Sequence, residues 1–293
     1  MRVRALRSVS LFGAVALAAV AGCGGQKGAG DDAKASARRA ALVAEAWDGS
    51  AAAAAWRAGY HPMGDVVQLP RGGLRSRAEE EALRDHAVVL RGTLPGAGPK
   101  NGRVTWAGGR SVTRPMVGAA ESYEALAGGR ADGKPHLTVT GAKAGRMTVA
   151  TSRGPAVVPA WLFSLEGYAD PLKQVAVTAS PLPRPPIGWS RGVPGLPLAR
   201  VVRIAADGRS VTVIALDGAC DDGPVVTVLE TAGSVVLSGA VENREHGDCT
   251  KRARLRQVTV KLARPVGDRV VLDAHTGRPI PCEPAYGPSP SRS

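Results

Sequence analysis

Apolar residues recur at helical spacing early in the chain and at alternate positions further along. The helical pattern predicts a first helix from Asp31 to Asp48, because Asp31 or Asp32 can cap its start and Gly49 can end it. Its larger apolar side chains share one face, which we expect to pack on the rest of the fold. They are Leu42, Val43, Ala46 and Trp47.

Three shorter helices are predicted before the middle of the chain. They span residues 51–58, 76–86 and 116–127. Ser76 and Glu79 have the spacing of a capping box at the start of the second of these helices. Pro115 stands where the first turn of the last helix tolerates a proline.

Alternating apolar and polar positions predict six strands between and after these helices. They span residues 87–90, 103–106, 136–140, 147–151, 157–165 and 174–178. Because the helices come early and the strands late, residues 33–179 are expected to form one α+β domain.

A composition change separates this domain from the rest of the chain. Residues 180–199 contain six prolines, which predict an extended linker rather than a helix or a central strand. Residues 200–283 then show short strands with turns between them, and residues 284–293 are expected to be a disordered tail.

Three hairpins are predicted in residues 200–283. Their strand pairs are 201–205 with 210–214, 224–230 with 234–241, and 255–262 with 269–272. Asp207-Gly208 is a strong hairpin turn signal. The chain as a whole is therefore expected to be a β-rich α+β fold, whose C-terminal domain is an antiparallel β-sandwich or barrel.

The first 23 residues have the features of an export signal. Arg2, Arg4 and Arg7 precede an uncharged run over residues 11–21, which is too short to span a bilayer. The run ends in Val20-Ala21-Gly22-Cys23, which resembles the lipobox of bacterial lipoproteins.

The lipobox resemblance implies a particular address for the protein. Residues 1–22 would be a signal peptide cut after Gly22, and Cys23 would carry a diacylglyceryl thioether and further acylation, such as palmitate. The partner it implies is the outer face of the cell membrane, with residues 23–32 as a flexible tether.

The chain also resembles secreted lipoproteins of high-GC actinobacteria. The segments that carry this resemblance, besides the lipobox, are residues 151–156, 158–163, 264–269 and 273–277. The resemblance implies an extracytoplasmic location and supplies no chemistry.

The net charge of +13 does not by itself indicate a nucleic-acid partner. The basic residues are scattered, without the interleaved aromatic side chains that stack on bases. The densest basic run, residues 251–256, follows an acidic stretch over residues 242–248. This arrangement favours a solvated hairpin of mixed charge, with contact to anionic lipid or wall polymer as the alternative.

Three cysteines remain once Cys23 is lipidated. In an oxidising compartment one disulfide is expected, and we pair Cys220 with Cys249 because both lie in loops of one predicted sheet. Cys282 could instead pair with either of them or with a partner protein. A metal site is not predicted from the cysteines, because no Cys-x-x-Cys occurs and His246 is the only nearby histidine with plausible ligand spacing.

Two segments contain serines that are candidates for chemistry. Ser190 lies in a Gly-x-Ser-x-Gly match, but flanking prolines exclude the strand and helix that a nucleophile elbow needs. Ser152 and Arg153 could line a pocket with Trp161, although the same aromatic segment could instead supply the core of its domain.

The sequence therefore favours a non-enzymatic binding or structural role in the cell envelope, with an envelope protein or wall component as partner. No catalytic residue, cofactor or metal is predicted. One alternative is an envelope hydrolase that uses Ser152 or Ser190 as its nucleophile. The other is a small-molecule-binding lipoprotein, although the alternating βα pattern of transporter-type binding proteins is missing.

Overall fold

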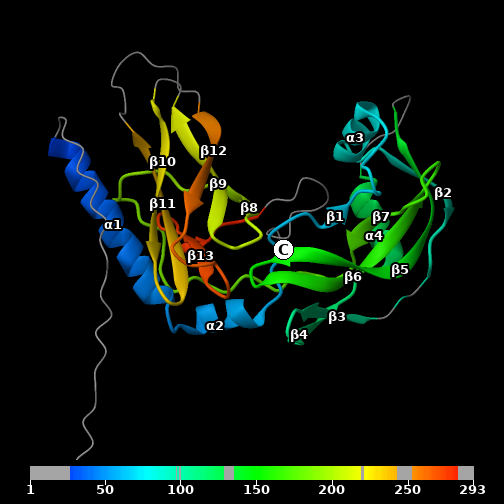
Figure 1. The fold of residues 1–293 in the computed structure, drawn as a ribbon, viewed down its shortest axis with the longest axis horizontal. Helices are drawn as coiled ribbons and strands as arrows, with labels where there is room; N and C mark the ends of the chain where they lie inside the picture. The colour runs from blue at the N-terminus through cyan, green and yellow to red at the C-terminus, as the bar shows by residue number, and fades with distance from the viewer. Residues whose placement is uncertain are drawn as a thin grey trace, which may run out of the picture.

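The computed structural model describes residues 27–282, apart from residues 97, 99, 129–134, 219–220 and 243–252. The described residues form a β-rich α+β fold, which confirms the predicted fold class. Figure 1 shows two lobes side by side. We call residues 60–179 the mixed-sheet lobe, and residues 27–59 with 180–282 the sandwich lobe.

The mixed-sheet lobe contains one curled seven-stranded sheet and two short helices. Its elements are β1 (Val67–Gln68), α3 (Arg77–Arg84), β2 (Val88–Thr93), β3 (Asn101–Trp106), β4 (Ser111–Pro115), α4 (Ala119–Leu126), β5 (Leu137–Thr151), β6 (Gly154–Leu165) and β7 (Leu172–Val175). The order is β1-β7-β6-β3-β4, and β5 pairs with β6 and, in parallel, with β2.

Two expectations for this lobe need correction. The strands expected at 136–140 and 147–151 are one continuous strand, β5, because β6 pairs with it along nearly its whole length. A Cβ at Gly145 would touch the end of the Leu162 side chain of β6, so this glycine leaves room for that side chain. Pro115 ends β4 rather than opening α4, whose N-cap is Gly118. The cap of α3 is as predicted, because the Ser76 side chain accepts from the Glu79 N–H.

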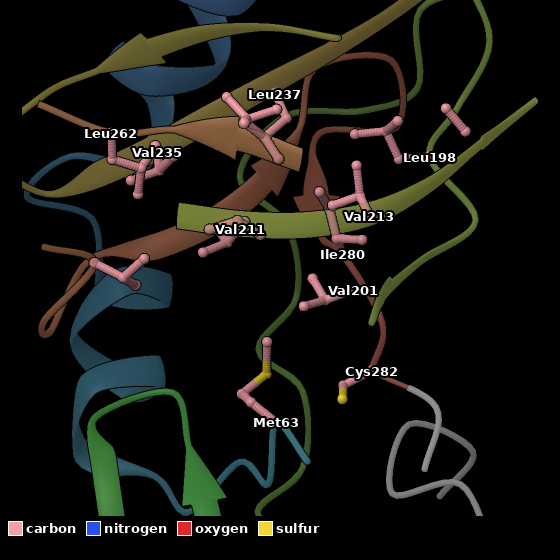
Figure 2. Close-up of a cluster of buried hydrophobic side chains, with 14 residues drawn as sticks. Met63, Leu198, Val201, Val211, Val213, Val235, Leu237, Leu262, Ile280 and Cys282 are labelled. Carbon is pink, nitrogen blue, oxygen red and sulfur yellow. The ribbon is translucent and has the colours of Figure 1, made fainter. Parts of the chain in front are cut away.

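The sandwich lobe contains two sheets that face one another. One has the order β12-β9-β8 and the other β10-β11-β13-β14. The strands are β8 (Arg200–Ile204), β9 (Ser210–Gly218), β10 (Gly223–Glu230), β11 (Ser234–Glu242), β12 (Ala253–Lys261), β13 (Val270–Asp273) and β14 (Arg278–Pro279). Valine and leucine side chains from both sheets fill the core between them (Figure 2).

Two of the three predicted hairpins form. β8 pairs with β9 around Gly208, which has a φ of 69°, and β10 pairs with β11. The third hairpin is wrong: β12 pairs with β9, whereas β13 pairs in parallel with β11. The connection crosses between sheets because Val266 enters the core and buried Arg269 donates to the backbone carbonyls of Arg264 and Pro265.

The first two helices, α1 (Lys27–Trp47) and α2 (Ala51–Ala58), pack on the sandwich lobe. Ala40, Val43, Ala44 and Trp47 form a core with Val236, Val270 and Leu272 of β11 and β13. Both helices were expected to belong to the domain at residues 33–179. They pack instead on strands that follow the proline-rich segment. The pattern of alternating strands could not show which sheet would cover them.

Details of α1 also differ from expectation. Leu42 is 54% exposed, because the buried face follows Ala40, Val43, Ala44 and Trp47 instead. The helix begins at Lys27, so Asp31 and Asp32 lie inside it rather than capping it, and residues 27–32 of the expected tether are helical.

The proline-rich segment 180–199 is a strap held against α1 and the β13–β14 turn. Arg39 of α1 donates from Nε to the carbonyl of Ala274 at 2.8 Å and from Nη2 to the carbonyl of Gly188. Ser36 donates to the carbonyl of Pro194 at 3.3 Å. The prolines keep the strap extended, and these contacts attach it to the sandwich lobe.

Candidate functional site

The expected lipid-attachment residue, Cys23, lies outside the described residues. The first described element, α1, begins four positions later at Lys27 and packs on β10 and β11. A chain of four residues spans at most about 14 Å when fully extended. Along the sequence, the sandwich lobe is therefore the part of the described fold that comes first after Cys23.

The three residues expected to share a pocket are not all brought together. Trp161 is buried in the core of the mixed-sheet lobe, where its Nε1 donates to the carbonyl of Val117 at 2.9 Å. Ser152 and Arg153 lie at the junction between the lobes, where the Ser152 N–H donates to the carbonyl of His61 at 2.9 Å. Trp161 thus takes the core role that was the alternative interpretation.

Ser190 lies on the strap, without the surroundings of a nucleophile elbow. Within the described segment 180–199 there is neither a strand before Ser190 nor a helix after it. Its N–H donates to the carbonyl of His275 at 3.1 Å, and the neighbouring Trp189 meets the His275 ring edge-on at 5.6 Å. The contacts at this position organise the strap.

The predicted disulfide between Cys220 and Cys249 falls outside the described residues and stays a prediction. Cys282, the one cysteine inside them, is buried in the core of the sandwich lobe. Its backbone forms a bridge with Val201, whose N–H donates to the carbonyl of Pro281 at 2.7 Å.

A short extended segment, residues 60–63, joins the two lobes. It follows the end of α2, and Pro62 bridges to Thr151 at the end of β5. The Met63 N–H donates to the carbonyl of Ala150 at 2.8 Å, yet the Met63 side chain enters the core of the sandwich lobe (Figure 2). The segment therefore contacts both lobes through a few residues.

The junction gathers buried polar groups that lack partners. His61 is only 3% exposed, and its ring stacks on Trp56 with centroids 4.0 Å apart. Neither ring nitrogen of His61, nor the hydroxyl of Tyr60 or Ser152, has a hydrogen-bond partner among the described residues. Each buried polar group without a partner usually lowers the stability of a fold by about 1–3 kcal/mol. A cluster of such groups therefore indicates a functional position.

Burial and positive charge determine the ionisation of this cluster. Burial lowers the pKa of His61 to about 4, and the charges of Arg114 and Arg153 lower it further; the Trp56 backbone, close to the ring but outside hydrogen-bond geometry, offsets this only in part. Burial also raises the pKa of the Tyr60 hydroxyl above its ordinary range. Both side chains are therefore neutral at neutral pH.

Arginine side chains surround the junction. Arg153 lies 3.9 Å above the ring of Trp106 and reaches the carbonyl of Gly59 at 3.4 Å. Arg114 donates to the carbonyl of Ala179 at 2.6 Å. Arg110 forms an exposed ion pair with Asp268 at 3.3 Å, which links the mixed-sheet lobe to the sandwich lobe.

A small cavity lies between the lobes beside His61. Its lining is Trp56, His61, Pro62, Met63, Ala179, Leu182, Pro279, Ile280, Pro281 and Cys282. Its volume of about 20 Å³ is room for roughly one water molecule, so it is too small for an organic substrate or cofactor. Its size instead suits a single atom or small ion.

The described part of the chain has neither a clustered metal-ligand set of the usual residue types nor a membrane-spanning helix. Among those residues, no group of three or more His, Cys, Asp or Glu side chains is placed to hold a metal ion. None of the described helices is both long and apolar enough to cross a membrane.

Comparison with known proteins adds no further assignment: no protein family, curated protein or solved structure matches the chain.

Of the junction residues, Ser152 and Arg153 were singled out from the sequence, whereas His61 and Met63 were not. One signal was available, because His61 and Met63 alternate along an extended segment and therefore project to the same side. No sequence signal connects them with Cys282, since the two segments are far apart in the chain and meet only through the packing of the lobes.

Proposed function

We propose that the chain is a lipoprotein anchored to the outer face of a bacterial cell membrane, with a non-enzymatic binding or structural role in the envelope. The observation that carries this proposal is the lipobox at Val20-Ala21-Gly22-Cys23, preceded by a basic segment and a short apolar run. Two acyl chains on Cys23 are enough for stable anchoring.

The placement of α1 supports an anchored role. Because α1 packs on the sandwich lobe and starts four positions after Cys23, the sandwich lobe would be held within reach of the bilayer surface. The mixed-sheet lobe is inserted between the two segments that form the sandwich lobe, and it would be available for contacts with an envelope protein or wall component.

The serine positions favour a binding role over the hydrolase alternative. The Ser152 hydroxyl is buried and has no hydrogen bond to the nearby His61 imidazole, and Ser190 lies in an irregular strap. A nucleophile needs a base in hydrogen-bond reach and access for a substrate.

Acylation and location test the anchor. Cells expressing the wild type, Cys23→Ala or the matched control Gly25→Ala are labelled with an alkyne fatty acid and fractionated. We expect label and membrane association in the wild type and Gly25→Ala, and neither in Cys23→Ala. An unlabelled wild type, or a Cys23→Ala protein that stays with the membrane, would contradict the anchor.

Cross-linking and chemical labelling test the role. Cross-linking in intact cells, followed by pull-down on a C-terminal tag, should give envelope partners with the wild type that are lost with Cys23→Ala. A serine-reactive fluorophosphonate should leave Ser152 and Ser190 unmodified. An adduct on either serine would instead support the hydrolase.

A further inference from the structure

Three side chains with metal-donor atoms, two of them soft sulfur donors, line the junction cavity. His61 and Met63 come from the segment that joins the lobes, and Cys282 comes from the end of the sandwich lobe. Figure 2 shows the sulfur atoms of Met63 and Cys282 at the same end of the core. We propose that this cavity binds one Cu(I) ion through the imidazole of His61, the thioether of Met63 and the thiolate of Cys282.

The burial of His61 and its unpaired ring nitrogens suit it as a metal ligand. It is 3% exposed, it lines the cavity, and neither of its ring nitrogens has a partner among the described residues. A bound metal would satisfy a nitrogen that is otherwise buried at a cost.

Met63 supplies the third donor, the thioether sulfur, beside the imidazole of His61 and the thiolate of Cys282. Its side chain is buried, like that of Cys282, so the two sulfur atoms are held in place rather than exposed to solvent. Thioether and thiolate are soft ligands of the kind that suit Cu(I), and imidazole suits copper as well. The cavity volume of about 20 Å³ limits the site to one ion.

Charge balance favours a monovalent ion over a divalent one. A thiolate and Cu(I) sum to zero charge, which an apolar cavity lined largely by proline, alanine, leucine and isoleucine can bury. A divalent ion would leave one positive charge uncompensated, near the guanidinium groups of Arg114 and Arg153. Within the described lining no carboxylate is present to offset it.

Binding requires one proton transfer and no change of oxidation state. The Cys282 thiol releases its proton to solvent as the sulfur binds Cu(I), while His61 and Met63 bind as neutral donors. The apparent affinity should therefore rise with pH.

The test uses the full-length protein as purified from its cells, in detergent micelles and under anaerobic conditions. Cu(I) is titrated in competition with a chromophoric chelator, and X-ray absorption identifies the bound atoms. We expect one ion per chain with two sulfur donors and one nitrogen donor. Cys282→Ala should abolish binding, and the volume-conserving Met63→Leu should weaken it at least tenfold. Met147→Leu, which changes a methionine equally buried in another core, should bind as the wild type does.

Three results would overturn the proposal. The first is equal Cu(I) affinity in the wild type, Cys282→Ala and Met63→Leu. The second is binding that disappears only with Cys220→Ser and Cys249→Ser. The third is a wild type that takes up Zn(II) at these residues but not Cu(I). Circular dichroism of each variant verifies its fold, and if Cys282→Ala does not fold, Met63→Leu still decides. The site does not rest on the anchor, so failure of the titration leaves the lipoprotein proposal unaffected.

Discussion

The imidazole of His61 stacks on the indole of Trp56, with ring planes inclined by only 7°. Trp56 belongs to α2, which packs on the sandwich lobe, whereas the backbone of His61 is hydrogen-bonded to the mixed-sheet lobe through Ser152. This pair of rings therefore spans the junction. The stability of the junction should depend on the charge of one imidazole.

We expect the protein to lose stability as the pH falls from about 6.5 to about 4. The folded chain holds the pKa of His61 near 4, below its ordinary value of 6.5, so the unfolded chain binds a proton first. Above pH 6.5 the two states are equally neutral and the effect is absent. The loss amounts to roughly 3 kcal/mol by pH 4.

Urea denaturation of the wild type and His61→Phe between pH 4 and 7 measures this effect. Phenylalanine keeps an aromatic ring against Trp56 and cannot ionise. The pH dependence of the wild type should be steeper than that of His61→Phe in this window. Parallel curves would show that His61 does not titrate as its burial requires.

Gly59→Ala should disturb the same ring pair. A Cβ at Gly59 would clash with Nε2 of His61 and lie 3.1 Å from Cβ of Ser180, so the ring must move. Forced repacking of this kind costs about 1–3 kcal/mol. Gly96→Ala, where a Cβ meets open space, is the matched control. Near-ultraviolet circular dichroism should report the loss of the Trp56 stack in Gly59→Ala alone.

Arg39 is expected to hold the strap in place. Its guanidinium bonds to the carbonyls of Ala274 and Gly188, and Arg39→Met leaves the buried Ala274 carbonyl without that donor. We expect a loss of about 2–4 kcal/mol in the free energy of unfolding, measured by urea denaturation. Arg38→Met removes the same charge from the neighbouring exposed position and should change stability by less than about 0.5 kcal/mol. Similar losses in both variants would argue against a strap contact.

Asp217 should contribute more to the stability of the fold than an acidic residue in an exposed ion pair does. Its side chain is completely buried, and one carboxylate oxygen contacts Arg254 and Arg256 at 3.0 Å each. Asp217→Asn removes the charge that both arginines share, which should cost about 1–3 kcal/mol. Glu81→Gln breaks the exposed pair with Arg77 and should cost less than about 0.5 kcal/mol. Thermal unfolding of both variants compares them directly.

Local signals predicted local structure well. Ser76 caps α3 as its spacing to Glu79 indicates, and Asp207-Gly208 turns the hairpin of β8 and β9. These features depend on the conformations and hydrogen bonds of a few neighbouring residues. The third hairpin was wrong because nothing within residues 255–272 shows that two strands joined by a short turn belong to different sheets.

The sequence by itself determined the β-rich α+β class, the short helices and two of the hairpins, because periodicity and turn chemistry act over a few residues. The lipobox, from which the anchor is predicted, is likewise a local motif. Only the tertiary structure decided that α1 covers the sandwich lobe, that the proline-rich segment is a bound strap, and that His61 and Met63 meet Cys282. Those pairings join residues more than 100 positions apart. They depend on which apolar faces bury one another, which no local pattern records.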